Sequence, residues 1–226
     1  MNLRHVAIVP DGNRRWSKLH GVPALEGHRR GAETMHRVVD YLIDRQVKYL
    51  TVWGFSTDNW KRSDDETNSL FHLLEAWIDK DTPWLHEQGV RLRHLGRLKE
   101  LPDFLRVTMN RSVELTSENT GMTLNLAFNY TGRAELLDAV SRLVRDDLPF
   151  KIDEDLFSRY LYTEGMPDVD LVIRTAGEFR LSNFMLWQTA YSELFFSDLL
   201  WPDFNEKELE KALKIYSQRC RRFGGD

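Results

Sequence analysis

Short apolar segments alternate along this chain with longer segments whose apolar residues recur at helical spacing. Six segments have the composition of strands: residues 6–9, 49–55, 90–95, 122–129, 170–173 and 194–196. Helices are expected between and after them, over residues 31–45, 66–88, 102–118, 134–148, 153–162 and 205–222. Because strand and helix alternate throughout, the pattern predicts an α/β fold with a central, mostly parallel six-stranded sheet flanked by helices.

The length and the absence of linkers predict one catalytic domain over residues 1–226. A chain of 226 residues is long enough for one large α/β domain, and it contains no internal repeat or low-complexity stretch. The polar run at residues 57–67 is the segment that we expect to be mobile, because it follows the second strand in a position suited to an active-site loop.

The net charge indicates which kinds of partner to expect, and the cysteine content indicates the cellular compartment. The formal net charge is −4, so we expect no nucleic-acid partner, although arginines gather in short runs at residues 14–15, 29–30 and 219–222. The single cysteine, Cys220, cannot form a disulfide within the chain, which favours a reducing, cytoplasmic location. No apolar run approaches the roughly 18 residues of a membrane span, and peripheral membrane contact stays open.

Chemically specific residues follow the first predicted strand at the point where it ends. Pro10 stops the apolar run and is followed by Asp11 and Gly12, and then by two arginines at residues 14–15. A carboxylate can hold a hard cation, a glycine lets backbone N–H groups approach an anion, and guanidiniums match phosphate oxygens. A strand followed by a turn, with solvated arginines, explains these residues equally well.

Two other strand ends repeat this pattern. Ser56, Asn59 and Arg62 follow the second strand, and Arg174 and a second guanidinium six residues later follow the fifth. In open α/β sheets ligands bind at the carboxyl ends of the strands, so the three segments are expected to meet at one edge. Paired guanidiniums and a hydroxyl can surround a diphosphate, which makes a phosphorylated ligand the favoured interpretation.

Four segments occur in a specific order. They are HVAIVPDGNRRW at residues 5–16, FSTDNW at 55–60, DLVIRT at 170–175 with Gly177 and Glu178, and LWQ at 186–188 continuing to WPDF at 201–204. This ordered set resembles the cis-prenyltransferases, the undecaprenyl diphosphate synthase family. The resemblance extends from His5 to the RFG at residues 222–224 and implies an α/β enzyme.

The resemblance implies a Mg²⁺-dependent prenyltransferase. It would condense isopentenyl diphosphate with an allylic diphosphate, such as farnesyl or geranyl diphosphate, to give a cis-polyprenyl diphosphate. Asp11 and Glu193 would hold the metal, and Asp11 and Asn59 would be the catalytic residues. The substrate-binding residues implied by the motifs and their neighbours are Gly12, Asn13, Arg14, Arg15, Trp16, His28, Ser56, Thr57, Asp58, Trp60, Arg62, Arg174, Arg180, Leu181, Ser182, Arg222 and Gly224.

The same resemblance implies where the parts of the two substrates bind. Residues 12–15, His28 and Arg62 would surround the allylic diphosphate, while Arg174, Arg180 and Ser182 would hold isopentenyl diphosphate. Trp16, Asn59 and Trp60 would flank the reacting carbons. The tail at residues 222–224 would reach the site of a partner subunit, which implies a homodimer.

Two positions depart from the family pattern. Ala24 stands where many relatives have an arginine, which weakens one diphosphate contact, and Phe179 stands where many have a histidine, so we interpret it as a wall residue. The acidic run at residues 64–66 suits a helix start by complementing the helix dipole. Because an amide is a poor base, Asn59 is assigned to orientation or proton relay, with a diphosphate oxygen as the final acceptor.

A growing prenyl chain needs an apolar channel. The sheet face near Trp53 and Phe55, with the helix that carries Leu70, Leu74 and Trp77, is the candidate, and core packing explains the same residues equally well. A larger residue at position 54 in place of glycine is expected to shorten the product.

Two other functions stay open. One is a phosphohydrolase with Asp11 as nucleophile, which lacks the expected second aspartate because residue 13 is asparagine. The other is a non-catalytic subunit that lends its tail to an active partner.

Overall fold

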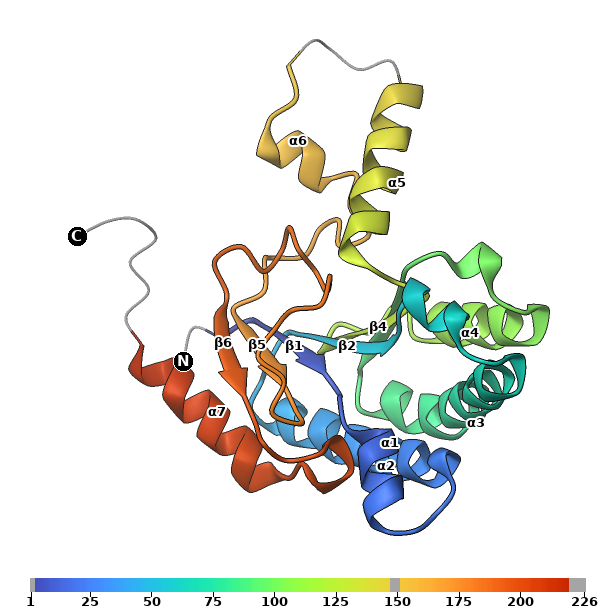
Figure 1. Cartoon of the computed structure of the whole chain (residues 1–226). Coiled ribbons are helices and arrows are strands. Elements are labelled where there is room, and N and C mark those ends of the chain that lie inside the picture. The colour runs from blue at the N-terminus through green and yellow to red at the C-terminus, as the bar shows by residue number, and fades with distance from the viewer. Residues whose placement is uncertain (1–2, 147–150, 220–226) are drawn as a thin grey trace.

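The computed structural model describes residues 3–146 and 151–219, and a six-stranded sheet forms its centre (Figure 1). All five strand pairs are parallel, in the order β3-β4-β2-β1-β5-β6. The strands are β1 (His5–Val9), β2 (Tyr49–Phe55), β3 (Arg91–Leu95), β4 (Thr123–Phe128), β5 (Leu171–Arg174) and β6 (Glu193–Phe196). The predicted α/β fold is confirmed, and each predicted strand lies within two residues of an observed one.

Helices connect the strands from β1 to β5, whereas a long segment without a helix joins β5 to β6. The α-helices are α1 (Asn13–Leu19), α2 (Ala24–Asp44), α3 (Asp64–Glu87), α4 (Asp103–Leu115), α5 (Gly132–Arg145), α6 (Glu154–Ser158) and α7 (Glu206–Gln218). Short 3₁₀ helices occur at η1 (Thr57–Lys61), η2 (Leu98–Glu100) and η3 (Trp201–Asp203). Asn205 caps α7 by accepting a hydrogen bond from the backbone N–H of Glu208 at 3.2 Å, as its position before the helix predicted.

Four features of the helices differ from the prediction. Helix α1, whose seven residues carry two apolar side chains, Trp16 and the exposed Leu19, was not predicted, and α2 begins at Ala24 instead of residue 31. The helix expected over residues 153–162 ends at Ser158. The run at residues 57–67, expected as a loop, forms η1 and the first turn of α3, where Ser63 caps the helix ahead of three acidic residues.

Gly27 and Gly31 lie near the start of α2, where α1 packs closely against it. A Cβ atom on Gly27 would lie 2.2 Å from the carbonyl oxygen of Asn13, and one on Gly31 would lie 2.5 Å from Asn13 Oδ1. Helix α1 therefore packs so closely against α2 at these two positions that only glycine fits there.

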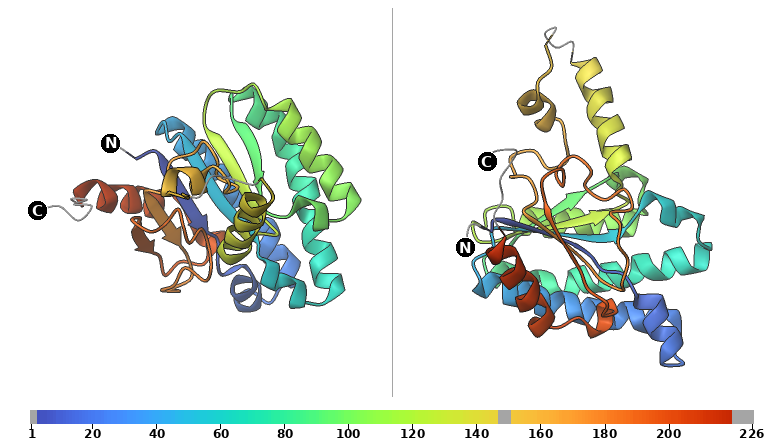
Figure 2. Two further views of the ribbon diagram at one scale, coloured as in Figure 1. Left: turned by 90° about the horizontal axis from the view of Figure 1, so that it is seen from above. Right: turned by 60° about the vertical axis from the view of Figure 1, so that its left-hand side comes forward.

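The two faces of the sheet are covered differently (Figure 2). Helices α2, α3, α4 and α7 pack on one face, where Val6 and Ile8 of β1 contribute to the larger apolar core. On the other face Ala7 and Val9 pack with residues of the long segment after β5, such as Phe184 and Met185. Helix α5 extends away from this second face together with α6 (Figure 1).

Some sequence predictions fall outside the described residues. These concern Cys220, Arg222, Gly224 and the ends of the helices expected over residues 134–148 and 205–222. Within the described ranges, every helix is too short or too polar to traverse a lipid bilayer.

Candidate functional site

The carboxyl ends of β1, β2 and β5 meet at one pocket of about 350 Å³. Strand β1 lies between the other two, with Val9 in register with Arg174 of β5. From these three strand ends the pocket is lined by Asp11, Gly12, Asn13, Arg14, Arg15, Ser56, Asn59, Arg62, Arg174, Glu178, Arg180 and Ser182. The structure therefore brings together the segments that the sequence analysis placed at one sheet edge.

Gly12 fixes the turn between β1 and α1. Its φ of 110° lies in the region that side chains rarely adopt, and a Cβ atom there would lie 2.9 Å from Leu200 Cδ2 and 3.1 Å from Ala176 Cβ. Only glycine fits this turn without displacing its neighbours. The turn directs Asp11 and the arginines of α1 into the pocket.

Arg174 is the most deeply buried cation of the pocket, with 4% of its surface exposed. Its Nε and Nη2 donate to Asp11 Oδ2 at 2.9 and 2.6 Å, and its Nη1 donates to Ser182 Oγ at 2.8 Å. The side chain thus joins the end of β1 to the loop after β5. Ser182 adopts a φ of 51°, which is uncommon for a non-glycine residue and typical of binding loops.

Glu178 and Glu66 form ion pairs with the remaining arginines of the site. Neither carboxylate was predicted as a site residue. Glu178 Oε1 accepts from Arg15 Nη2 at 2.9 Å, and its Oε2 accepts from Arg180 Nη1. Glu66 Oε1 lies 3.2 Å from Arg62 Nη1 and 3.6 Å from Arg14 Nη1. The hydrogen bond from Arg180 and the charges of Arg180 and Arg15 lower the pKa of Glu178, which keeps it ionised.

His28 and Asn13 present unsatisfied polar atoms at the pocket. Among the described residues, His28 Nε2 and Asn13 Oδ1 have no hydrogen-bond partner although both atoms are buried. Burial, followed by the positive charge of Arg62, lowers the pKa of His28 to about 4. His28 is therefore neutral at pH 7, and its ring can serve a ligand as donor or acceptor.

The residues of η1 are divided between the pocket and local contacts. Ser56 and Asn59 line the pocket, and Asn59 Oδ1 accepts the backbone N–H of Ser56 at 2.9 Å. Trp60 Nε1 donates to Asn129 Oδ1 at 2.8 Å, while Thr57 Oγ1 lies 3.1 Å from Thr131 Oγ1. The exposed Asp58 pairs with Lys61.

Several residues of the predicted set do not line the pocket. Trp16 is buried, stacks on His20 and donates from Nε1 to Asp203 Oδ1 at 2.8 Å, so it packs beside η3. The other residues of the predicted set that do not line the pocket are Thr57, Asp58, Trp60 and Leu181.

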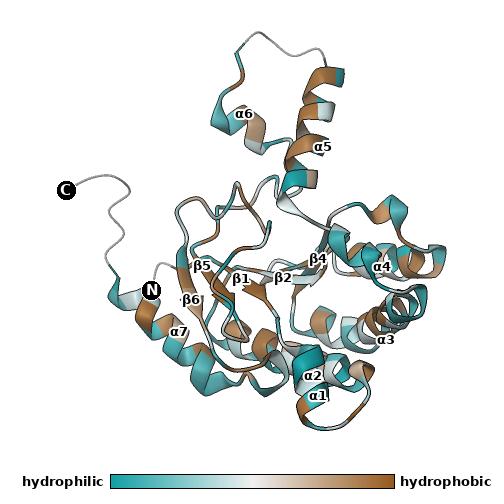
Figure 3. Ribbon diagram, viewed as in Figure 1, coloured by the Kyte–Doolittle hydropathy of each residue, from teal (hydrophilic) through white to brown (hydrophobic). Residues whose placement is uncertain are grey.

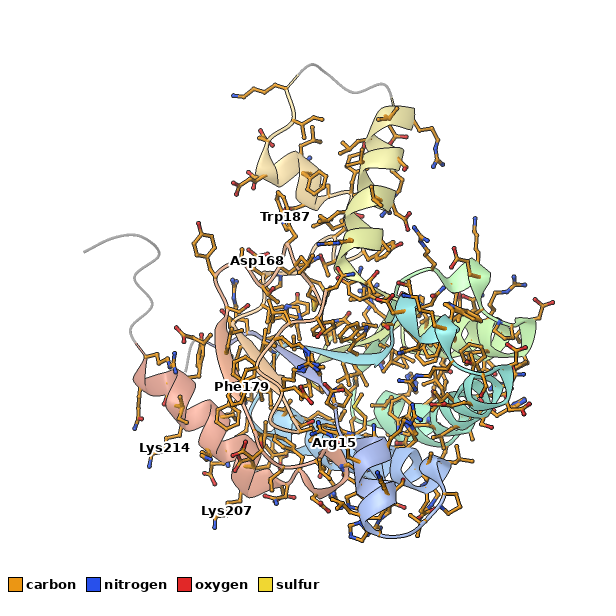
Figure 4. The ribbon with its side chains drawn as sticks, viewed as in Figure 1. Arg15, Asp168, Phe179, Trp187, Lys207 and Lys214 are labelled. Atoms are coloured by element: carbon orange, nitrogen blue, oxygen red, sulfur yellow. The ribbon has the colours of Figure 1, made fainter. Side chains whose placement is uncertain are left out.

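The interpretation of Phe179 as a wall residue is wrong. Its ring is 73% exposed and packs on Phe196 instead (Figure 4). Ala24 is exposed at the start of α2.

Glu193 lies at the opposite end of the sheet from Asp11. It is the first residue of β6 and is in register with Leu171, which pairs with Val6 of β1. Three strand residues, roughly 10 Å, separate Val6 from Val9 before the chain reaches Asp11. The two carboxylates predicted to hold the metal ion therefore do not meet within this chain. Glu193 accepts from Arg219 Nη1 at 2.8 Å. Within the described ranges, no three His, Asp or Glu side chains form a metal-binding group.

A second, apolar pocket of about 130 Å³ continues from the first one. Both pockets include Pro10, Asn13, His28, Gly54 and Leu70, and the second is otherwise lined by apolar side chains of α2, α3, β2, β4 and η3. Leu74 and Trp77 belong to it as predicted. Trp53 and Phe55 line the polar pocket instead. Trp53 stacks on Phe184 at the other face of the sheet, and Phe55 packs on Phe71 and Phe128 in the larger apolar core.

An outer groove of about 470 Å³ extends this route to the surface between α2 and α3. It includes Ala32, Leu73 and Trp77, which also line the apolar pocket. The three hollows thus adjoin one another in order, from the pocket with the arginines to the groove that His36 and Asp81 line.

Comparisons with known proteins agree with this arrangement. The family model described as putative undecaprenyl diphosphate synthase matches residues 9–224. The isoprenyl transferase of Fusobacterium nucleatum is 47% identical over 222 residues, covering 98% of this chain and 96% of the relative. The isoprenyl transferase of Thermotoga maritima is 47% identical over 225 residues, covering 98% of this chain and 97% of that one.

Two solved structures are similar over nearly the whole chain. Lavandulyl diphosphate synthase from Lavandula x intermedia, in complex with dimethylallyl diphosphate, has a TM-score of 0.95 and 36% identity, covering 98% of each chain. A probable undecaprenyl diphosphate synthase from Campylobacter jejuni has a TM-score of 0.85 and 32% identity, covering 99% of each chain. The chain is thus an isoprenyl transferase and belongs to the undecaprenyl diphosphate synthase family.

Proposed function

We propose that this enzyme condenses isopentenyl diphosphate with an allylic diphosphate, such as farnesyl or geranyl diphosphate, and extends a cis-polyprenyl diphosphate. The observation that carries the proposal is the set of five arginines, from three strand ends, around one pocket. Among the described residues, two carboxylates line the same pocket, Asp11 and Glu178. Such an excess of guanidinium groups suits two diphosphates better than one neutral ligand.

The two diphosphates are assigned to different strand ends. The allylic diphosphate would bind at residues 12–15 with His28 and Arg62, beside the mouth of the apolar pocket. Isopentenyl diphosphate would bind at Arg174, Arg180 and Ser182. This places the allylic hydrocarbon chain where it can enter the apolar pocket and leaves the small homoallylic substrate in the polar one.

Positioning and electrostatics would supply the catalysis. As the allylic C–O bond breaks, negative charge grows on the departing diphosphate, and the guanidiniums of Arg14, Arg15 and Arg62 can stabilise it. Holding isopentenyl diphosphate on the neighbouring strand end keeps its double bond close to the allylic carbon. Asn59, whose Oδ1 is engaged by Ser56, would orient a substrate, and a diphosphate oxygen would accept the final proton.

Asp11 is the residue that would hold Mg²⁺. Its side chain is 39% exposed at the pocket, and this ion commonly binds through one or two carboxylates together with substrate phosphates and water. A single carboxylate beside a diphosphate site therefore fits the ion without Glu193. When bound, the ion would neutralise charge on the leaving diphosphate.

The apolar pocket and the outer groove form the proposed channel for the growing chain. A larger side chain at Gly54, which lines both pockets, is still predicted to shorten the product, although its Cβ would approach Phe128 Cδ2 at 3.0 Å. The path between α2 and α3 gives a long product a route past Trp77.

A homodimer is part of the proposal. Figure 3 shows apolar residues along α5. Three of its apolar residues are exposed to solvent: Leu137 by 64%, Val140 by 46% and Val144 by 78%. Their spacing places them on one face of the helix, which a second copy could cover. A cytoplasmic location, with membrane contact through the lipid product, remains our prediction.

One assay tests the proposal. The purified chain is supplied with farnesyl or geranyl diphosphate, labelled isopentenyl diphosphate and Mg²⁺, and the products are analysed by chromatography. We expect chain-extended cis-polyprenyl diphosphates. Release of inorganic phosphate without chain extension would favour the phosphohydrolase instead, and no reaction would favour the non-catalytic subunit.

A further inference from the structure

Glu178 connects two strand ends that the proposed function assigns to different substrates. Arg15 belongs to the segment after β1, and Arg180 belongs to the loop after β5. One oxygen of Glu178 accepts from each of these guanidiniums. A single carboxylate thus occupies, in the free enzyme, one arginine from each of the two diphosphate sites.

The geometry makes the two contacts interdependent. Arg15 Nη2 also donates to the carbonyl oxygen of Ala176 at 2.9 Å. Arg180 Nε donates to Ser182 Oγ at 3.1 Å. Each guanidinium thus has a second contact that fixes its position beside Glu178. A diphosphate that takes the hydrogen bond from Arg15 Nη2 displaces Oε1 of Glu178. The neighbouring Gly177 has a φ of 65°, and the side chain of Glu178, which follows this turn, is 25% exposed.

From this bridge we infer that Glu178 couples the two diphosphate sites, so that binding of either substrate favours binding of the other. The first diphosphate displaces the carboxylate and bears the cost of breaking the bridge. The second diphosphate then finds its arginine already released. Binding free energies coupled in this way are reciprocal, so each ligand raises the affinity of the other by the same factor.

The expected coupling is modest because the bridge is partly hydrated. The side chains of Arg15 and Arg180 are 52% and 58% exposed, and ion pairs of this kind are weak. We therefore expect Glu178 to contribute a coupling of about fivefold, at the lower end of the usual range for linked sites.

Glu66, which pairs with arginines of the same pocket, provides a matched control. It also joins two arginines, Arg62 and Arg14, but both of these belong to the proposed allylic site. Removing its charge is therefore expected to change the affinity for the allylic ligand alone. It should leave the coupling between the two ligands as it is.

The inference rests on the proposed function, and calorimetric titration can test the two separately. Isopentenyl diphosphate is titrated into the enzyme with Mg²⁺, with and without a saturating, unreactive allylic thiodiphosphate, and the ratio of the two affinities is the coupling factor. We expect this factor to fall about fivefold in Glu178→Gln and to stay within about twofold of the original in Glu66→Gln. Glu178→Asp keeps the charge but is too short to span both guanidiniums, so it should lose the coupling as well.

Specific results would overturn the inference. A coupling factor that is unchanged or larger in both Glu178 variants, or that falls equally in Glu66→Gln, contradicts a bridge through Glu178 while leaving the proposed function intact. If neither ligand binds the original enzyme, the proposed function fails, and the inference fails with it.

Discussion

The guanidinium of Arg174 donates two hydrogen bonds to one oxygen of Asp11, from Nε at 2.9 Å and from Nη2 at 2.6 Å. Asp11 follows β1 and Arg174 ends β5, so this pair joins two strand ends that are far apart in the sequence. In the free enzyme it neutralises a buried cation. A metal ion or a diphosphate that enters the pocket must rearrange this pair.

Asp11→Asn is predicted to remove most of the activity. The amide has no charge with which to hold Mg²⁺, and losing one such contact to transition-state charge typically costs a factor of about 100 or more in turnover. Arg174 would also lose its carboxylate partner, which should lower the free energy of unfolding by roughly 1–3 kcal/mol. Steady-state kinetics and urea unfolding measure the two effects.

Asp79→Asn is the control for this substitution, because Asp79 pairs with the exposed Arg111 away from the pocket. It should change neither turnover nor stability appreciably. An Asp11→Asn enzyme with near-normal turnover would contradict the role of Asp11.

Ala32→Phe is predicted to shorten the product. Ala32 lines both the apolar pocket and the outer groove, so a large ring there would close the path between them. Ala76 lines only the outer groove, and Ala76→Phe should allow more additions than Ala32→Phe. Product length is read by chromatography, and identical product distributions for the original enzyme and Ala32→Phe would exclude this route.

Gly27→Ala is predicted to destabilise the contact between α1 and α2. The new Cβ would lie 2.2 Å from the carbonyl oxygen of Asn13 and 2.4 Å from Ser17 Oγ, and overpacking of this kind typically costs about 1–3 kcal/mol. Because Asn13 lines the substrate pocket, we also expect a higher KM for the allylic substrate. Arg30→Ala, on the exposed side of the same helix, should change stability by less than about 0.5 kcal/mol. Equal stability of Gly27→Ala and the original enzyme would refute the close packing.

Stability is predicted to fall as the pH drops from about 6.5 toward 4. Burial lowers the pKa of His94 to about 4, and that of His5 likewise to about 4, from the ordinary value of 6.5. Below pH 6.5 the unfolded chain therefore binds protons that the folded chain does not, which favours unfolding until the pH reaches the folded-state pKa. By pH 5 the loss should be roughly 1–2 kcal/mol for each buried imidazole.

Urea unfolding of His94→Gln at pH 7.5 and pH 5 isolates one of these contributions. The variant cannot be protonated, so the original enzyme should lose more stability than the variant on acidification. His72→Gln, at an exposed position, should follow the original enzyme. The same pH dependence in His94→Gln and the original enzyme would contradict the assignment.

The fold followed from the sequence because its strands and most of its helices have strong patterns. The buried run at residues 6–9 and the amphipathic pattern of α2 and α3 contain enough apolar residues at fixed spacing to identify them. Helix α1 could not be identified in this way. It has two apolar side chains, Trp16 and Leu19, and Leu19 is exposed. It packs against glycines 27 and 31 of the next helix, and in the sequence alone these glycines suggest a break in a helix.

The site residues that could be predicted from the sequence are those that follow the carboxyl end of a strand. Asp11, Arg62 and Arg174 all stand at carboxyl ends and meet in one pocket. Glu193 is the first residue of β6, whereas Asp11 follows the last residue of β1. In a parallel sheet the first and last residues of the strands lie at opposite ends, so strand direction alone argued against a pairing of Glu193 with Asp11. The bridges made by Glu178 and Glu66 depend on side-chain conformations, which no spacing rule specifies.

The convergence of two diphosphates on one pocket is tested most directly by a crystal structure of the enzyme with Mg²⁺, isopentenyl diphosphate and an unreactive allylic thiodiphosphate. We predict that one diphosphate contacts the turn at residues 12–15 and the other contacts Arg174, Arg180 and Ser182. A structure in which this pocket holds a single diphosphate and the second ligand lies elsewhere would contradict the account.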